Sequence, residues 1–184
     1  VLKIKYVAEV SDGHGHAGAQ ELTITLVGSD SQPDGPSNLM TGFVFAEVAQ
    51  GAVVVNGTSG NDIIHATSAN DVLTGGAGAN AINASGFSGS STITGAAGND
   101  TLTGGSGADS LDGGGGNDVL SGGPGTDLLV GGAGSDTASY IDELQSGVTV
   151  DLAVAGPQDT GGGDLDTLVD MENLTGSLYD DILF

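Results

Sequence analysis

Five consecutive nine-residue segments between Gly95 and Ser139 share one pattern, and they constrain the fold more than any other feature of the chain. Each has glycine at positions one and four, glycine or alanine at two, aspartate at six and an aliphatic residue at eight. Written in order they are GAAGNDTLT, GGSGADSLD, GGGGNDVLS, GGPGTDLLV and GGAGSDTAS. Glycine-rich sequence usually forms a flexible linker. In a linker, however, aspartates and aliphatic residues would not recur at a strict spacing, as they do here. The pattern therefore indicates a repeat architecture.

The positions of the repeat have separate physical roles. Glycine at positions one, two and four suits a tight turn with positive φ values. The aspartate at six directs its carboxylate into the concavity of this turn, and the next three residues form a short strand whose aliphatic side chain points inward. We therefore predict an all-β, right-handed parallel β-roll in which two repeats make one coil. Its predicted inward-facing residues are Leu102, Leu111, Leu120, Leu129 and Ala138.

Stacking of such coils brings aspartates that are eighteen residues apart to the same edge. The predicted pairs are Asp100 with Asp118, Asp118 with Asp136, and Asp109 with Asp127. Two carboxylates about 5 Å apart repel by roughly 3 kcal/mol at an effective dielectric constant near 20. The repeats contain no lysine or arginine to offset this repulsion. Carboxylate and carbonyl oxygens are hard ligands, so we predict that several calcium ions occupy these edges.

Residues 57–94 carry the same repeat in a less regular form. GTSGNDIIH and ATSANDVLT retain Asp62 and Asp71, whereas Asn80 and Ser91 stand at the aspartate position of the next two repeats. A neutral oxygen lacks the charge that holds a divalent ion, so we expect these turns to bind calcium weakly or not at all. Residues 84–85 are an insertion. The aliphatic positions are retained as Ile64, Leu73, Ile82 and Ile93.

The segments before the repeats differ in composition. Residues 1–28 alternate apolar and polar side chains on both sides of a glycine-rich turn, which predicts a β-hairpin. His14 and His16 lie in that turn, and we interpret them as solvated turn residues rather than metal ligands. Residues 29–38 contain two prolines and read as a linker. Residues 39–56 are apolar and are predicted to form strands that cap the roll at 57–139.

After Ser139 the repeat is interrupted. Residues 140–175 are predicted to be a spacer or capping segment, and residues 176–184 resume the repeat, with Asp181 at the ligand position and Leu183 inside. The acidic residues Asp164, Asp166 and Asp170 fit solvated loop positions and a further calcium site equally well.

Composition excludes several functions. The formal charge of -22 disfavours nucleic acid and anionic membrane surfaces as partners. The chain has no cysteine, so disulfides do not stabilise it. It shows no apolar run of membrane-spanning length, no signal peptide and no HExxH or GxSxG motif, so we expect no catalytic role. The chain begins without methionine and ends within a repeat, and we expect it to be part of a longer polypeptide.

The repeats resemble those of the RTX (repeats-in-toxin) family, whose motif is G-G-x-G-x-D-x-U-x. The resemblance covers residues 57–184. It implies export by type I secretion, folding outside the cell on contact with calcium, and calcium bound between stacked turns. The phrase YVAEVSDGHGHAGAQELTITLVGSD near the N-terminus resembles the closing strands of VCBS or cadherin-like adhesin repeats. The chain is therefore expected to be an extracellular calcium-binding module of a large surface adhesin, or alternatively the non-catalytic tail of a secreted enzyme such as a protease, lipase or epimerase.

The resemblance also implies the metal ligands, which are aspartate carboxylates and the carbonyl groups of the preceding turns. The aspartates of the regular repeats are Asp100, Asp109, Asp118, Asp127 and Asp136. The turn glycines are Gly95, Gly104, Gly113 and Gly122 at position one, and Gly98, Gly107, Gly116, Gly125 and Gly134 at position four. The position-five residues are Asn99, Ala108, Asn117 and Thr126, and the aspartates of the irregular repeats are Asp62, Asp71 and Asp181.

Overall fold

The computed structural model describes residues 2–11, 17–26, 43–45, 52, 54–66, 68–141, 146–161 and 164–184. The chain divides into two compact units, Val1–Met40 and Thr41–Phe184. In the first unit, β1 (Leu2–Ser11) pairs with β2 (Ala17–Leu26) in antiparallel register. This pairing confirms the predicted hairpin. His14 and His16 lie outside the described residues.

The second unit contains two seven-stranded sheets, and none of its described residues is helical. The strand order of the first sheet is β15-β16-β12-β10-β8-β6-β4, and that of the second is β17-β13-β11-β9-β7-β5-β3. The bounds of the first sheet are β4 (Val54–Asn56), β6 (Val72–Ala77), β8 (Thr92–Ala97), β10 (Ser110–Gly116), β12 (Leu128–Gly134), β15 (Gln158–Gly161) and β16 (Asp164–Val169). Those of the second are β3 (Phe43–Phe45), β5 (Ile63–His65), β7 (Ala81–Asn83), β9 (Thr101–Thr103), β11 (Val119–Ser121), β13 (Thr137–Ser139) and β17 (Asn173–Thr175).

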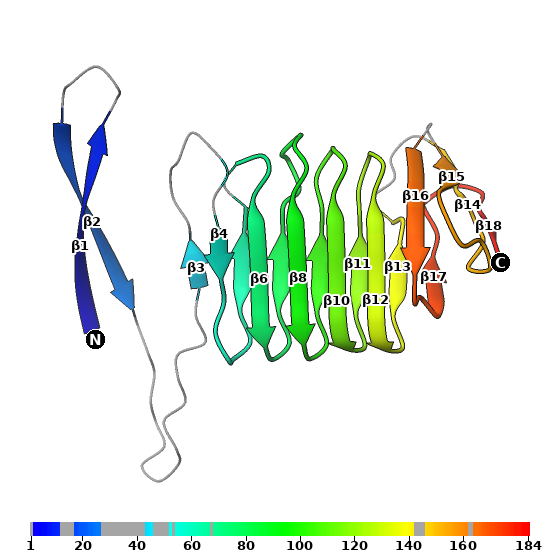
Figure 1. Cartoon of the computed structure of the whole chain (residues 1–184), viewed down its shortest axis with the longest axis horizontal. Helices are drawn as coiled ribbons and strands as arrows, with labels where there is room; N and C mark the ends of the chain where they lie inside the picture. Colours follow the sequence, from blue (N-terminus) through cyan, green and yellow to red (C-terminus); the bar gives the residue numbers. More distant parts are fainter. Residues whose placement is uncertain are drawn as a thin grey trace, which may run out of the picture. The chain divides into compact units, whose positions relative to one another are not determined.

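From β3 to β13, successive strands alternate between the two sheets, which makes a stack of parallel coils (Figure 1). Leu111 pairs with Leu129 and with Ile93, so one coil contains eighteen residues, as the repeat predicts. Leu73 pairs with Ile93, which is two residues further along the chain than an eighteen-residue coil would place its partner. The two extra residues are the insertion at 84–85. The fold is a parallel β-solenoid that matches a β-roll of nonapeptide repeats.

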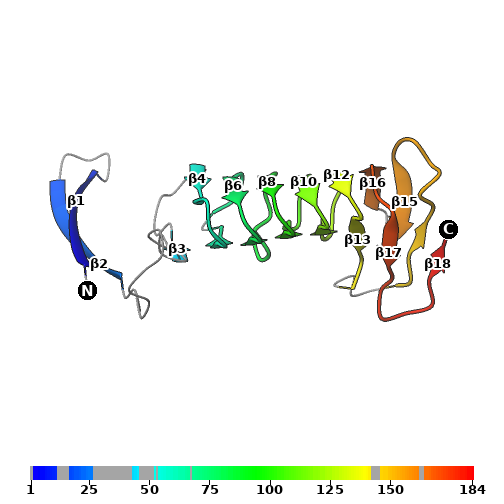
Figure 2. The same cartoon turned by 90° about the horizontal axis from the view of Figure 1, so that it is seen from below.

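Figure 2 shows the strands of the roll in two facing rows. The core between the two sheets is a double row of aliphatic side chains. Every predicted inward-facing residue of the roll is buried, and most have no exposed surface. Burying one such side chain stabilises the fold by about 1.5–3 kcal/mol. The buried members of the two rows are Val55, Ile64, Leu73, Ile82, Ile93, Leu102, Leu111, Leu120, Leu129, Ala138 and Leu168.

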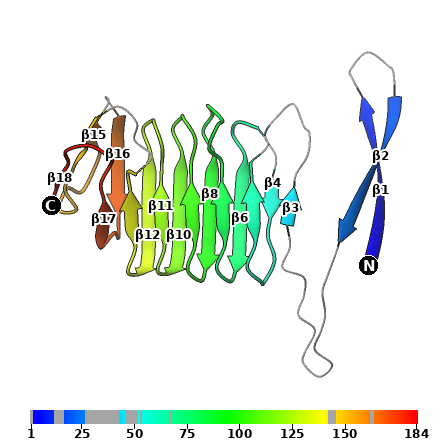
Figure 3. The same cartoon turned by 180° about the vertical axis from the view of Figure 1, so that it is seen from behind.

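The segment predicted as a spacer or cap extends the stack. Strand β16 pairs with β12, and β17 pairs with β13, so both sheets gain a strand beyond the last regular repeat. Strand β15 then adds antiparallel to β16. These strands lie at one end of the stack (Figure 3), with the separate pair β14 (Thr149–Val150) and β18 (Ile182–Leu183) beside them.

Leu183 is not buried as the sequence predicted. Its side chain is 39 % exposed, because β18 pairs with β14 and does not continue either of the two main sheets. The partner position Val150 is fully buried. Therefore the last repeat does not extend the core of the roll.

Candidate metal centre

The aspartates of the regular repeats form two ladders, one along each edge of the stack. The backbone N–H of Asp100 donates to Oδ1 of Asp118 at 2.7 Å, and that of Asp118 donates to Oδ1 of Asp136 at 2.8 Å. On the other edge the N–H of Asp109 donates to Oδ1 of Asp127 at 2.8 Å. The structure thus brings together the three aspartate pairs predicted from the sequence.

The irregular repeats continue both ladders with neutral side chains. Asp62 donates its N–H to Oδ1 of Asn80 at 3.0 Å, and Asn80 donates its own to Oδ1 of Asp100 at 2.7 Å. On the other edge Ser91 donates to Oδ1 of Asp109 at 2.6 Å. The backbone geometry of the ladder therefore does not depend on a carboxylate at every coil.

The second carboxylate oxygen of most regular aspartates has no hydrogen-bond partner. These aspartates are at most 2 % exposed. Asp109 differs, since its Oδ2 accepts the N–H of Gly105 at 2.7 Å. A buried carboxylate without a partner is strongly unfavourable unless a cation compensates it. The buried oxygens without a partner are Oδ2 of Asp100, Asp118, Asp127 and Asp136.

Asn80 reveals which atoms surround that second oxygen. Its Nδ2, which replaces Oδ2 of an aspartate, donates to the carbonyl of Gly78 at 3.0 Å and to those of Gly76 and Gly95 at 3.5 Å. Three carbonyl oxygens therefore surround Nδ2. Two belong to positions two and four of the same turn, and the third belongs to position one of the repeat on the next coil. Where aspartate stands in place of Asn80, an oxygen faces this oxygen cradle with no hydrogen between them. Such a set of hard oxygen ligands fits calcium.

The position-one glycine is required for a different reason from the one predicted. Within the regular repeats, the glycines with positive φ stand at position two or four, for example Gly114 (φ 96°) and Gly116 (φ 138°), and none stands at position one. A Cβ at Gly113 would lie 2.8 Å from the carbonyl oxygen of Gly131 and would also contact Oδ2 of Asp118. Position one therefore needs glycine because a carboxylate and a carbonyl converge over its α-carbon.

The remaining predicted turn ligands occupy two arrangements. The position-four glycines stack backbone on backbone, and a Cβ at Gly116 would meet the carbonyl of Gly98. At position five, the side chain of Asn99 accepts the N–H of Asn117 at 2.9 Å, and the side chain of Asn117 accepts the N–H of Ser135 at 3.0 Å. These asparagine side chains form an exposed ladder of their own. Ala108 and Thr126 are exposed on the opposite edge.

The three aspartates of the irregular repeats are satisfied by hydrogen bonds. Oδ2 of Asp62 accepts the N–H of Thr58 at 2.6 Å and its hydroxyl at 3.0 Å. The Ser68 hydroxyl donates to Asp71 at 2.6 Å, and the Ser177 hydroxyl donates to Asp181 at 2.7 Å. These aspartates therefore differ from the regular ones in accepting a hydroxyl hydrogen from their own turn, and their role as calcium ligands stays a prediction.

The local environment shifts the acidity of the ladder. Burial raises the pKa of Asp100 and that of Asp118, where the carboxylates of Asp100 and Asp136 add to the effect. Burial, reinforced by the carboxylates of Asp166 and Asp109, raises the pKa of Asp127 to about 7. In contrast, hydrogen bonds from the Val148 N–H and the Ser177 hydroxyl lower the pKa of the exposed Asp181. The central carboxylates are thus held in surroundings that disfavour their charge.

Two further ladder residues come from the interrupted segment: Asp166, which the sequence left undecided, and Glu172, which it missed. Asp166 accepts the N–H of Asp127 at 2.9 Å, and Glu172 accepts the N–H of Asp136 at 2.8 Å. Each acid stands two residues before a leucine, as aspartate does in the repeat, so a search for D-x-L and E-x-L would have found both. The sequence left undecided whether Asp166 and Asp170 are solvated loop residues or calcium ligands. Asp166 is buried in the ladder, at 2 % exposure, whereas the side chain of Asp170 is exposed.

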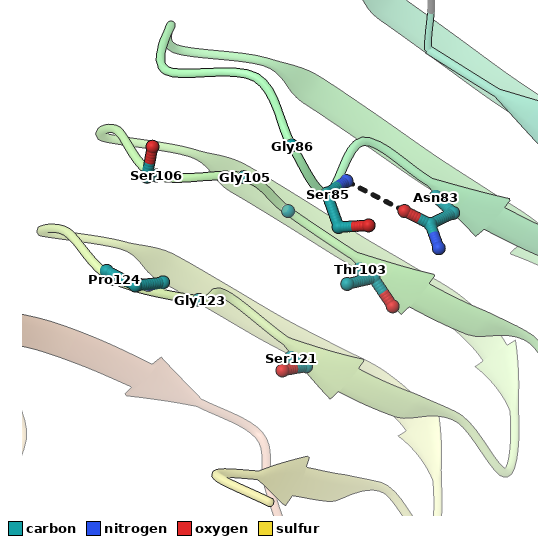
Figure 4. A pocket seen from close by; sticks show the side chains of 10 residues that line it. Asn83, Ser85, Gly86, Thr103, Gly105, Ser106, Ser121, Gly123 and Pro124 are labelled. Atoms are coloured by element: carbon teal, nitrogen blue, oxygen red, sulfur yellow. Dashed lines mark hydrogen bonds between the residues drawn. The ribbon is translucent and has the colours of Figure 1, made fainter. Parts of the chain in front are cut away.

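No group of three or more acidic, histidine or cysteine side chains gathers anywhere in the described part of the chain. The sites accordingly depend on main-chain carbonyls. A groove of about 520 Å³ lies on the outside of the roll beside the insertion, where Asn83 accepts the N–H of Ser85 at 2.7 Å (Figure 4). Its lining contains no ionisable side chain, although it includes Gly104 and Gly105 from the turn of Asp109. The lining residues are Asn83, Ser85, Gly86, Thr103, Gly104, Gly105, Ser106, Ser121, Gly123 and Pro124.

The fold and the two ladders define a calcium-binding β-solenoid. The family model of the RTX calcium-binding nonapeptide repeat (4 copies) matches the chain at residues 56–87, 85–120 and 104–138. This part of the chain is therefore a run of RTX-type repeats, and such repeats bind Ca²⁺. No curated protein and no solved structure gives a significant match to the chain. Among the described residues, no helix is long and apolar enough to cross a membrane.

Proposed function

We propose that the chain is a structural module that folds on binding calcium outside the cell. One observation carries this proposal: four buried aspartates each have an oxygen without a partner, in a segment that contains no lysine or arginine. Because nothing else in the roll can compensate this charge, the compact fold and the bound ions are expected to form together. In such systems the free energy of metal binding is free energy of folding.

The residues of the ladder would control when folding occurs. Adjacent carboxylates on one edge stand about one strand spacing, 4.8 Å, apart, and each pair repels by about 3 kcal/mol at an effective dielectric constant near 20. Extracellular calcium modules bind with dissociation constants of about 10⁻⁴–10⁻³ M, far above cytosolic calcium. A bound ion would supply positive charge to the carboxylate and carbonyl oxygens of each turn. We therefore infer that the chain stays extended inside the cell and becomes compact outside.

The wider setting of the module is part of the same proposal. The acidic composition and the RTX-type repeats support an extracellular, type I-secreted protein, and the N-terminal strand pair resembles an adhesin repeat. We infer a structural and export role in a large surface adhesin, with other domains of that protein or cell-surface components as partners and with no catalytic role. The sequence that precedes Val1 would test this: further β-rich repeats support the adhesin, and a catalytic domain supports the tail of a secreted enzyme.

The folding proposal is tested by calcium titration of the purified chain. Far-UV circular dichroism and small-angle scattering should show an extended chain in excess chelator and a compact β-rich chain in millimolar calcium. Magnesium at the same concentration serves as the control. It demands octahedral geometry and retains its water, so it should produce little compaction. Equal compactness in chelator and in calcium would refute the proposal.

A further inference from the structure

The aspartate ladder on the Asp136 edge does not end at the last regular repeat. Thr137 pairs with Asn173, and Ala138 pairs with Leu174, so Glu172 lies beside Asp136 on the next coil. Its Oε2 accepts the N–H of Asp136 at 2.8 Å, as Oδ1 of Asp136 accepts that of Asp118 at 2.8 Å. A glutamate outside the repeats thus takes the structural place of a ladder aspartate.

The half-coil that carries Glu172 is shorter than a repeat. Asp166 and Glu172 are six residues apart, whereas Asp127 and Asp136 are nine apart. This half-coil lacks the glycine-rich turn, and Asp170 and Met171 precede the acid directly. The glutamate side chain is one methylene longer than aspartate, and it reaches the Asp136 N–H from this shortened backbone.

The backbone of Asp170 replaces a turn glycine of the missing repeat. A Cβ at Gly113 would lie 2.8 Å from the carbonyl of Gly131 on the next coil. A Cβ at Gly131 would meet the carbonyl of Asp170 and would lie 2.8 Å from Oδ2 of Asp136. The Asp170 carbonyl therefore stands where the position-one carbonyl stands in a regular site. Asp170 holds a left-handed φ of 50°, which is uncommon outside glycine and costs about 1 kcal/mol or more.

The remaining member of this cradle is a buried oxygen without a partner. Asp136 has no exposed surface, and its Oδ2 accepts no hydrogen bond. By analogy with the three carbonyls that surround the Asn80 amide, Oδ2 of Asp136 faces its own turn and the carbonyl of Asp170 on the coil beyond it. Glu172 adds a negative charge on the coil beyond Asp136, and no lysine or arginine follows Lys5 in the sequence.

We propose that Asp136, the Asp170 carbonyl and Glu172 form a calcium site at the end of the ladder, beyond the nonapeptide repeats. Asp136 supplies the buried oxygen, Asp170 supplies a main-chain carbonyl, and Glu172 supplies the second negative charge of the pair. This site rests on the proposed function, because it assumes that the regular repeats bind calcium. It places the interrupted segment in the calcium-dependent fold and does not leave it as a passive cap.

The ladder on the opposite edge ends at Asp166, and its last acid can be compared with Glu172. Oδ2 of Asp166 accepts the Thr160 hydroxyl at 2.9 Å, so this oxygen has a hydrogen-bond partner. Thr160 belongs to β15, which pairs antiparallel to β16. On this edge a hydroxyl satisfies the last carboxylate. On the Asp136 edge, Glu172 is exposed and no hydroxyl contact to it is observed in the described residues.

The test compares Glu172→Gln with Asp159→Asn by calcium-binding stoichiometry in equilibrium dialysis of the full chain. Both variants remove one negative charge from the interrupted segment, but Asp159 is exposed and lies outside the proposed site. Glutamine can still accept the Asp136 N–H, and asparagine can still accept the Gly161 N–H that Asp159 accepts. We expect Glu172→Gln to weaken one calcium site about tenfold, or about 1.4 kcal/mol, whereas Asp159→Asn changes no site more than about twofold. Glu172→Asp, which keeps the charge, should lose less than Glu172→Gln.

Each outcome decides between the two proposals. If wild type binds calcium and Asp118→Asn weakens it while Glu172→Gln binds as wild type does, the terminal site is refuted and the proposed function stands. Equal losses in Glu172→Gln and Asp159→Asn would show that only overall acidity matters, and this also refutes the site. If wild type binds no calcium, both proposals fail. Should Glu172→Gln not fold, Glu172→Asp is compared with Asp159→Asn, and equal binding by Glu172→Asp, Asp159→Asn and wild type refutes the site.

Discussion

Replacing Asp118 by asparagine should weaken calcium binding far more than the same change at Asp62. Asp118 lies between two charged neighbours, Asp100 and Asp136, and its Oδ2 is buried without a partner. Asp62 instead pairs with the neutral Asn80, and its Oδ2 already accepts two hydrogen bonds from Thr58. Asn80 shows that the ladder accepts an amide at this position, so Asp118→Asn removes charge without removing the acceptor for the Asp100 N–H.

The magnitude follows from two opposing terms. A divalent ion about 4 Å from one carboxylate gains roughly 8 kcal/mol at an effective dielectric constant near 20. Two neighbouring carboxylates about 4.8 Å away repel Asp118 by roughly 3 kcal/mol each under the same conditions. The net loss in the variant is therefore about 1.4–2.8 kcal/mol, which corresponds to a 10- to 100-fold rise in the calcium midpoint. Asp62→Asn should shift the midpoint less than about threefold, because no unpartnered oxygen is lost.

The same arithmetic predicts an opposite effect without calcium. Asp118→Asn removes two repulsions from the metal-free fold, so in excess chelator the variant should be more compact than wild type, whereas Asp62→Asn should match wild type. Far-UV circular dichroism during calcium titration measures the first effect, and small-angle scattering in chelator measures the second. The corresponding alanine variants should keep the same order of calcium midpoints. Equal midpoint shifts for the two sites would refute the pairing of the aspartates, and a less compact Asp118→Asn in chelator would refute the role of repulsion.

Two further predictions concern backbone strain and pH. Ala96 occupies position two with a φ of 85°, and the glycines at the same position, Gly114 and Gly132, have φ values of 96° and 98°. Ala96→Gly should therefore stabilise the calcium-bound fold by about 0.5–1 kcal/mol. Urea unfolding in saturating calcium measures this change, and a loss of stability would contradict the prediction. The pKa of Asp127 is raised to about 7, above its unfolded value, so the metal-free fold binds more protons than the unfolded chain and loses stability as pH rises from about 4 to 7. Circular dichroism at pH 5 and pH 8 should therefore show more structure at pH 5 in the absence of calcium. Equal signals at the two pH values would contradict this prediction.

The sequence predicts the periodic part of the molecule well because the same local features recur in every repeat. A turn of small residues, an aspartate and an inward aliphatic residue recur every nine positions, so the coil length and the Asp100, Asp118 and Asp136 ladder follow from counting. The core follows in the same way, and Ile64 and Leu73 are buried even where the turns have degenerated. Periodicity therefore carries the prediction even through coils whose turns have lost several glycines.

Prediction fails where a contact depends on the register of distant segments. Counting in nines passes over Asp166 and Glu172, because their half-coil has only six residues and its place on the stack is fixed by pairing of β16 and β17 with β12 and β13. Leu183 fits the pattern locally, yet it lies on the β14–β18 pair and is partly exposed. The reason for glycine at position one was also hidden, since the crowding over it comes from a carbonyl on the next coil.

The contrast between turns with and without a hydroxyl explains how one backbone supports two kinds of carboxylate. At position two, Thr58 and Ser177 donate a hydroxyl hydrogen to the aspartate four residues later. A glycine at that position, such as Gly114, offers no such donor, and the Oδ2 of Asp118 is left without a partner. In these two turns a hydroxyl donates to the carboxylate, whereas at Asp118 the charge is left to be compensated from solution. We therefore expect the calcium requirement to fall on the regular repeats and on the Asp136 end of the ladder, and the turns of Asp62 and Asp181 to depend on hydrogen bonds.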